Sequence, residues 1–113
     1  MDRLATAFPE LTSELVGGLE AAGRPDLAEQ LHKATVTKVT FDGSADAGYI
    51  YVSAGRPLNA VEQQVMGVKR GETLRLETEH EIIIDVDNFG RIAGIELLSP
   101  PGSWTGELRK RAV

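Results

Sequence analysis

One acidic segment has the spacing of a calcium-binding loop. Counting from Asp85, carboxylates occupy positions 1, 3 and 12, supplied by Asp85, Asp87 and Glu96, and Gly90 occupies position 6. Calcium loops use oxygen ligands at those positions and a glycine at position 6 for a sharp turn. Position 5 is Phe89, which has no side-chain oxygen, and the flanking runs favour strands instead of the two helices that such a loop needs. A turn between strands is therefore the main prediction, and a calcium site is the minority hypothesis.

The remaining ionisable residues give weak support for catalysis. Asp46 and Asp85 could serve as acid and base, but such a pair must share one cleft, and the sequence does not show that they meet. His32 lies near an expected helix end, and His80 falls on the apolar face of an expected strand. Cysteine is absent, which excludes thiolate zinc sites. We therefore predict a non-enzymatic protein without catalytic residues, a metal or a cofactor.

Composition restricts the class of partner. The chain has 113 residues, enough for one domain with a core, and 42% of them are hydrophobic. Its 17 acidic and 12 basic residues give a formal net charge of −5, which argues against a nucleic-acid binder. No apolar run has the length of a membrane span, and no signal peptide is evident. The expected location is the cytoplasm, without membrane contact.

The N-terminal part predicts a helical hairpin. Leucines recur every fourth residue within 9–23, as expected for one buried helical face. A second apolar edge follows within 25–33, and the short connection favours two antiparallel helices. Gly17 and Gly18 would either weaken the first helix or let it pack closely against the sheet. Residues 1–7 are expected to form a loosely ordered lead.

Strand-forming residues dominate from Thr35 onward. The run 74–86 alternates so far that it predicts either one bent strand or two strands meeting near Glu79. The expected strands are 35–41, 49–52, 61–68, one or two within 74–86, and 91–98. The predicted fold class is α+β, with the N-terminal helical hairpin packed on an antiparallel β-meander of five or six strands.

The chain divides into three parts of one domain: the hairpin at 1–34, the sheet at 35–98 and a C-terminal tail at 99–113. The tail carries three basic residues at 109–111 and is expected to be mobile, with Trp104 docked on the body. Alternatively, Trp104 anchors a partner, because aromatic side chains are favoured in interface hot spots.

Two motifs, Asp42–Ile50 and Ile84–Glu96, carry a family resemblance. They have the patterns D-x-x-A-D-A-x-Y-I and D-x-D-x-x-G-R-x-x-G-I-E. Together they resemble the family named domain of unknown function 2283, over about 36–98. The stretch 53–79 is longer than usual for that family, and the helical hairpin lies outside its pattern. The motif residues are Asp42, Ala45, Asp46, Ala47, Tyr49, Asp85, Asp87, Gly90, Arg91, Gly94 and Glu96.

The resemblance implies a meandering antiparallel sheet and no established activity. A structural role explains the acidic motif residues: Asp42 and Asp46 would accept amide hydrogens in the first turn, and Asp85 and Asp87 in the second. Tyr49 would pack its ring on the sheet while its hydroxyl finds a partner.

We expect a protein-interaction module, either a homodimer or an accessory that binds another protein. By analogy, the family resemblance allows an antitoxin-like role. The acidic strand residues Glu77, Glu79 and Glu81 could meet a basic partner, or could form an ordinary solvated face. A small-ligand or calcium site at the Asp85–Glu96 segment is the alternative, followed by a carboxylate enzyme.

Overall fold

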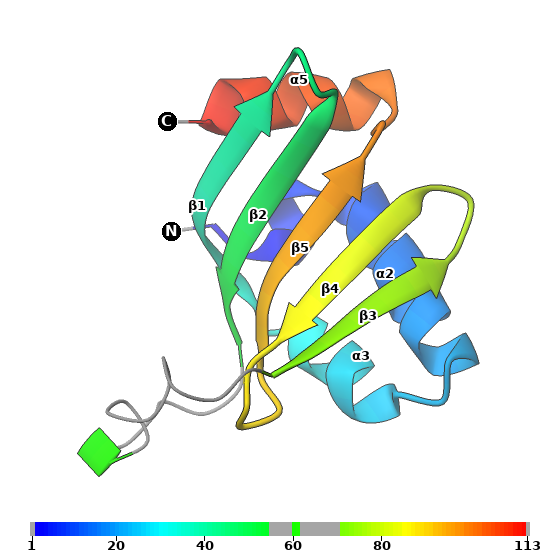
Figure 1. Cartoon of the computed structure of the whole chain (residues 1–113), viewed down its shortest axis with the longest axis vertical. Coiled ribbons are helices and arrows are strands. Elements are labelled where there is room, and N and C mark those ends of the chain that lie inside the picture. Colours follow the sequence, from blue (N-terminus) through cyan, green and yellow to red (C-terminus); the bar gives the residue numbers. More distant parts are fainter. Residues whose placement is uncertain (1, 55–59, 62–70, 113) are drawn as a thin grey trace.

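The computed structural model describes residues 2–54, 60–61 and 71–112. They form an α+β domain, which confirms the predicted fold class (Figure 1). The helices are α1 (Leu4–Ala7), α2 (Pro9–Ala21), α3 (Pro25–Leu31) and α5 (Gly102–Arg111). The strands are β1 (Thr35–Asp42), β2 (Ala47–Ser53), β3 (Glu72–Glu77), β4 (Glu81–Val86) and β5 (Ile92–Leu98).

The sheet is antiparallel throughout, in the order β1-β2-β5-β4-β3. β3, β4 and β5 form a meander. The β1–β2 hairpin joins it by the pairing of β2 with β5. The alternating run 74–86 divides into β3 and β4, which confirms two strands meeting near Glu79. The strand expected at 61–68 lies outside the described residues, apart from Val61, whose backbone is helical.

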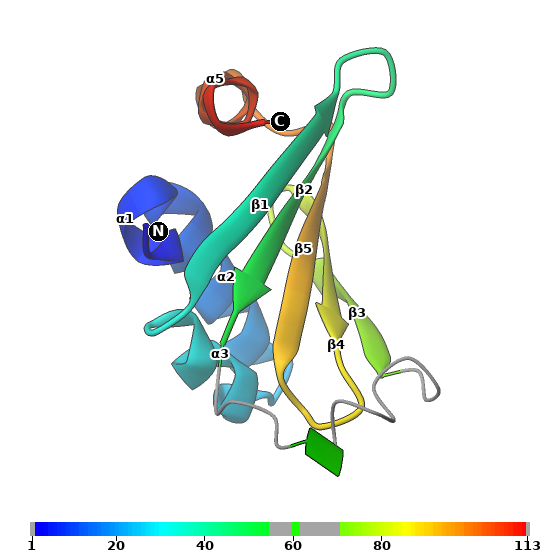
Figure 2. The ribbon, with the colours of Figure 1, turned by 90° about the vertical axis from the view of Figure 1, so that its left-hand side faces the viewer.

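The helices lie on one side of the sheet (Figure 2). The leucine face of α2 is fully buried, because its residues recur every fourth position and point at the inner face of the sheet. Burial of each such side chain contributes about 1.5–3 kcal/mol. The largest fully buried side chains are Leu4, Leu11, Leu15, Leu19, Leu27, Leu31, Ile50, Ile82, Ile84, Ile92, Ile95 and Leu97.

The N-terminal lead is ordered, contrary to the sequence-based expectation. Residues 4–7 form the short helix α1, and Leu4 is completely buried. The amide of Leu4 donates to the carbonyl of Ala34 at 2.9 Å, and Arg3 bridges to Thr35. A helix of one turn is too short to produce a periodic pattern of apolar residues in the sequence. Helix α1 is therefore evident only from its tertiary contacts.

The C-terminal segment also differs from the expected mobile tail, since it forms α5. Trp104 and Leu108, one helical turn apart, are both buried, which confirms the docking of Trp104 on the body. Leu108 packs over Gly48, where a Cβ atom would lie 2.8 Å from its Cδ1. The guanidinium of Arg109 lies 5.1 Å from the ring centre of Phe41. Two apolar anchors, together with contacts of Arg109 and Arg111, therefore hold a segment of mostly polar composition on the body.

The two adjacent glycines of α2 should respond oppositely to alanine. A Cβ at Gly17 meets nothing within 4 Å, whereas one at Gly18 would lie 2.7 Å from Cγ2 of Thr78. Only Gly18 therefore permits close packing on the sheet. We expect Gly17→Ala to raise the free energy of unfolding by about 1 kcal/mol through helix propensity. Gly18→Ala should lower it by about 1 kcal/mol or more through overpacking. Urea denaturation of both variants measures this, and equal effects would contradict the packing difference.

Candidate functional site

The face of the sheet turned away from the helices gathers most of the polar strand residues, and we call it the open face. Strand alternation and the pairing register place its members side by side across the five strands. They are Lys38, Thr40, Tyr49, Tyr51, Thr73, Arg75, Glu77, Glu81, Ile83, Asp85 and Glu96.

Tyr49 and Asp85 form the centre of the open face. The Tyr49 hydroxyl donates to Oδ2 of Asp85 at 2.6 Å, and Thr73 donates to Oδ1 at 3.3 Å. The Tyr49 ring lies over Gly94, where a Cβ would be 2.1 Å from the hydroxyl oxygen. Three motif residues thus make one contact: the glycine makes room for the ring, and the carboxylate orients it. This confirms the expected packing of Tyr49 and corrects the expectation that Asp85 caps a turn.

A second tyrosine extends this centre toward β1. Tyr51 is 41% exposed, and its ring centre lies 4.5 Å from that of Tyr49 at an angle of 53°. Nζ of Lys38 lies 5.7 Å from the Tyr51 ring centre. Beside them, Thr40, Tyr49 and Glu96 border an open hollow of about 260 Å³. The arrangement joins aromatic surface to a carboxylate. Tyr51 was not among the residues expected at a site, although the Tyr-Ile-Tyr alternation at 49–51 indicates that both rings lie on one face of the strand.

Carboxylates outnumber cations on this face. Arg75 forms an ion pair with Glu81. In the part of the chain that the structure describes, neither an arginine nor a lysine forms an ion pair with Glu77, Asp85 or Glu96. The open face is therefore acidic, with exposed aromatic surface at its centre.

Ionisation of Tyr49 should cost the protein stability at alkaline pH. Burial and then the Asp85 hydrogen bond raise the pKa of Tyr49 above its ordinary value of 10.0. Because the folded-state pKa is the higher one, the contribution of Tyr49 is complete below pH 10.0 and is lost as the pH rises above it. We expect the free energy of unfolding to fall as the pH rises above about 10. Tyr49→Phe should show a smaller fall in urea titrations, and an equal fall would assign the effect to other groups.

The motif residues in the turns hold two hairpins. Oδ1 of Asp42 accepts hydrogen bonds from the amides of Ser44 and Ala45, and these bonds together with the Ser44 hydroxyl lower the pKa of Asp42. Asp46 adopts a positive φ of 49°, and its carbonyl accepts the Ser99 amide. Asp42 therefore has the expected role, while Asp46 contributes through its backbone. Ala45 precedes it in the turn, and Ala47 follows it as the first residue of β2.

The second hairpin depends on Asp87. Its Oδ1 accepts from the amides of Phe89 and Arg91, and its Oδ2 pairs with the Arg91 guanidinium at 2.9 Å. Gly90 has the positive φ of 76° that closes the turn. Gln30 of α3 holds the hairpin to the body, donating to the Gly90 carbonyl and accepting from the amide of Ile92.

The structure does not assemble the calcium site. The Asp87 carboxylate is bound to the hairpin, and Asp85 and Glu96 lie on paired strands instead of a helix-flanked loop. Asp46 and Asp85 are also separated, because Asp85 lies level with Tyr51, about 13 Å along the sheet from the strand end that follows Asp46. Neither the three carboxylates of the calcium hypothesis nor the pair Asp46 and Asp85 shares a cleft.

The interaction candidates lie in different places. Glu77 and Glu81 face each other across β3 and β4 on the open face, while Glu79 lies in the connecting turn. Trp104 is 5% exposed and packs on the ring of His80, so it is a core residue and presents little surface to a partner.

A family model described as "Protein of unknown function (DUF2283)" matches residues 38–99, which are 62 of the 113 residues. The chain belongs to this family. The DUF2283 match covers β2, β3, β4, β5 and most of β1, so it contains every residue of the open face, whereas α1, α2, α3 and α5 lie outside it. No curated protein and no solved structure matches the chain. None of the described helices is long and apolar enough to cross a membrane.

Proposed function

We propose that this DUF2283 protein is a non-enzymatic interaction module whose open face binds a basic segment of a partner protein. The observation that supports the proposal best is the joining of the tilted Tyr49–Tyr51 pair with the carboxylates of Asp85 and Glu96 on the side of the sheet opposite the described helices. A cytoplasmic accessory role, of which an antitoxin that neutralises a basic protein would be one example, fits this chemistry.

Aromatic rings and carboxylates together favour cationic side chains. An arginine guanidinium can stack on an exposed tyrosine ring and pair with a carboxylate through two hydrogen bonds. Tyr51 offers such a ring, and Glu96 lies beside the hollow next to Tyr49. A partner arginine or lysine placed over this hollow would meet Glu96 and the ring of Tyr49, with the ring of Tyr51 next to them.

Charge also favours a basic partner over a second copy of the chain. Two open faces brought together would place the carboxylates of Glu77, Asp85 and Glu96 against the same acidic set, with only Lys38 and the already paired Arg75 to offset them. Like charges across an interface cost stability, whereas opposite charges also accelerate association.

Titration of the labelled protein with a lysine- and arginine-rich peptide tests the proposal. In NMR spectra of the ¹⁵N-labelled protein, we expect the basic peptide to change the chemical shifts of backbone amides along β1, β2 and β5. An acidic peptide of equal length should change none of them. Glu96→Gln and Tyr51→Ala should each weaken binding by about tenfold, the equivalent of about 1.4 kcal/mol. Glu20→Gln, an exposed change on α2, is the matched control and should bind normally.

Three results would overturn this proposal. The first is equal binding of acidic and basic peptides, and the second is shift changes confined to the helices. The third is a stable dimer in light scattering that Tyr51→Ala dissociates, since the open face would then be occupied by a second copy.

A further inference from the structure

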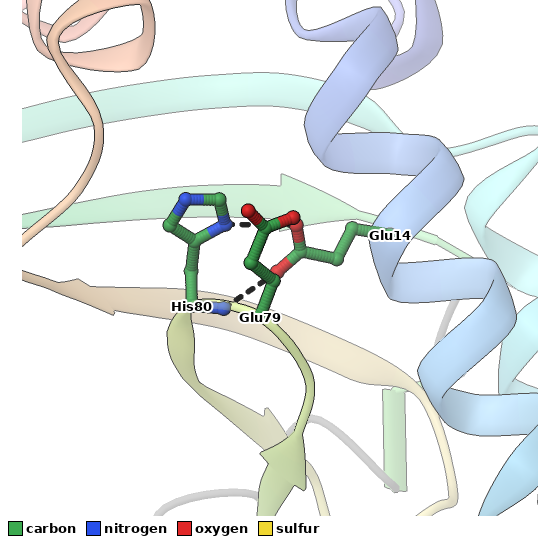
Figure 3. A group of neighbouring side chains, drawn as sticks. All are labelled: Glu14, Glu79 and His80. Carbon is green, nitrogen blue, oxygen red and sulfur yellow. Dashed lines mark hydrogen bonds and ion pairs between the residues drawn. The ribbon is translucent and has the colours of Figure 1, made fainter.

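A group of metal-binding side chains lies at the other side of the sheet, apart from the open face. Glu14 extends from α2 toward the β3–β4 turn, which supplies Glu79 and His80 (Figure 3). One donor atom from each residue lies within 4.8 Å of the other two. We propose that Glu14, Glu79 and His80 bind a divalent transition-metal ion of the zinc type. This proposal is independent of the open face.

The contacts of Glu14 orient it before any ion arrives. Its Oε2 accepts from the hydroxyl of Thr78 at 2.8 Å and from the backbone amide of His80 at 3.2 Å. Its Oε1 lies 2.9 Å from Nδ1 of His80. Hydrogen bonds to the second oxygen of a carboxylate hold the first in position, as outer-sphere partners do at metal sites.

The His80 ring is also held in place. The Trp104 ring packs on it with centres 4.6 Å apart and an angle of 54°. The His80 side chain is 25% exposed and that of Glu14 is 16% exposed, so both are shielded but can still be reached by an ion.

The two carboxylates give the group a negative charge, which favours the binding of a cation. Two carboxylates converge on one imidazole, and in the described ranges 2–54, 60–61 and 71–112 neither a lysine nor an arginine forms an ion pair with Glu14 or Glu79. Neighbouring carboxylates repel each other. A divalent ion between Glu14 and Glu79 would offset both charges at once.

The ligand types select the class of ion. An imidazole nitrogen with two carboxylate oxygens suits zinc and neighbouring transition metals, whereas calcium needs six to eight oxygens. Metal bonds of about 2.0–2.2 Å in a tetrahedral site place ligand atoms about 3.3 Å apart. The present separation of 2.9 Å between Glu14 and His80 must widen slightly. The exposed side chain of Glu79 can rotate inward, and water can fill the fourth position.

Binding uses the neutral imidazole with its proton on Nε2, so that Nδ1 presents its lone pair to the ion in place of its present contact with Glu14. The ion would then connect α2 directly to the β3–β4 turn.

Calorimetric titration of chelator-treated protein with zinc chloride tests the site. We expect one equivalent to bind and the melting temperature to rise with zinc, because an ion that binds the folded state stabilises it. Glu79→Gln and His80→Gln should each weaken binding by at least about tenfold. Glu79 forms no hydrogen bond in the described part of the chain, so Glu79→Gln should leave the fold intact, which a circular dichroism spectrum checks.

The second histidine provides the matched control. His32 is exposed beyond α3, and His32→Ala should keep full affinity for zinc. The absence of zinc binding by the unmodified protein would overturn the proposal. Equal loss in the His32 and His80 variants, or binding unchanged by Glu79→Gln and His80→Gln, would also overturn it.

Discussion

Replacement of Trp104 by alanine should lower the free energy of unfolding by about 3–5 kcal/mol, the range measured for large aromatic side chains removed from cores. Trp104 is 5% exposed and anchors α5, and it also packs on His80. The change therefore leaves a cavity and weakens the contact between α5 and the β3–β4 turn. Urea denaturation monitored by circular dichroism measures the loss.

Lys110→Ala is the matched control for this result. Lys110 lies on the same helix but is exposed, so its replacement should change the free energy of unfolding by no more than about 0.5 kcal/mol. A loss below about 1 kcal/mol for Trp104→Ala would mean that α5 contributes little to the domain. The segment would then behave as the mobile tail that its polar composition predicts.

Gly94→Val should cost about 2–4 kcal/mol, through overpacking and the loss of a hydrogen bond to a charged group. The added Cβ would lie 2.1 Å from the Tyr49 hydroxyl oxygen and 2.3 Å from ring carbons. Valine has two further methyl groups at this point, so the ring must leave its place over the glycine. The Tyr49 hydroxyl then loses its hydrogen bond to Asp85. Urea denaturation measures the cost.

A double-mutant cycle isolates the contact. In a Tyr49→Ala background the valine meets open space, so Gly94→Val should cost at least about 1 kcal/mol less than in the unmodified chain. The same cost in both backgrounds would show that strain in β5 itself, and not the tyrosine ring, excludes a side chain at residue 94.

Local chemistry explains why the second hairpin could be predicted from the sequence. Asp87 and Gly90 have the residue types that close a short turn, and both have that role. The helix faces were also predictable, because leucines at a spacing of four residues require a buried side. In each case the signal lies within a few neighbouring residues.

The candidate sites and the strand order depend on contacts between segments that are distant in the sequence. Asp85 resembles a turn residue in the sequence, yet it belongs to a strand, where Tyr49 from 36 positions earlier uses its carboxylate. Glu14 is one polar residue of an amphipathic helix, and only the packing of α2 brings it to His80, 66 positions away. No pattern within a few neighbouring residues indicates the pairing of β2 with β5 either. The candidate sites were therefore not predictable, although half of their residues were named.

The position of β5 has a consequence for how the protein is made. The last strand to leave the ribosome is the central strand of the sheet. A nascent chain that ends before Ile92 can form the β1–β2 and β3–β4 hairpins, but β2 and β4 each keep an unpaired edge, and such edges promote aggregation. Completion of the sheet thus waits for synthesis through Leu98, and a truncated product would be prone to aggregate. Correct assembly of the sheet therefore depends on the synthesis of β5.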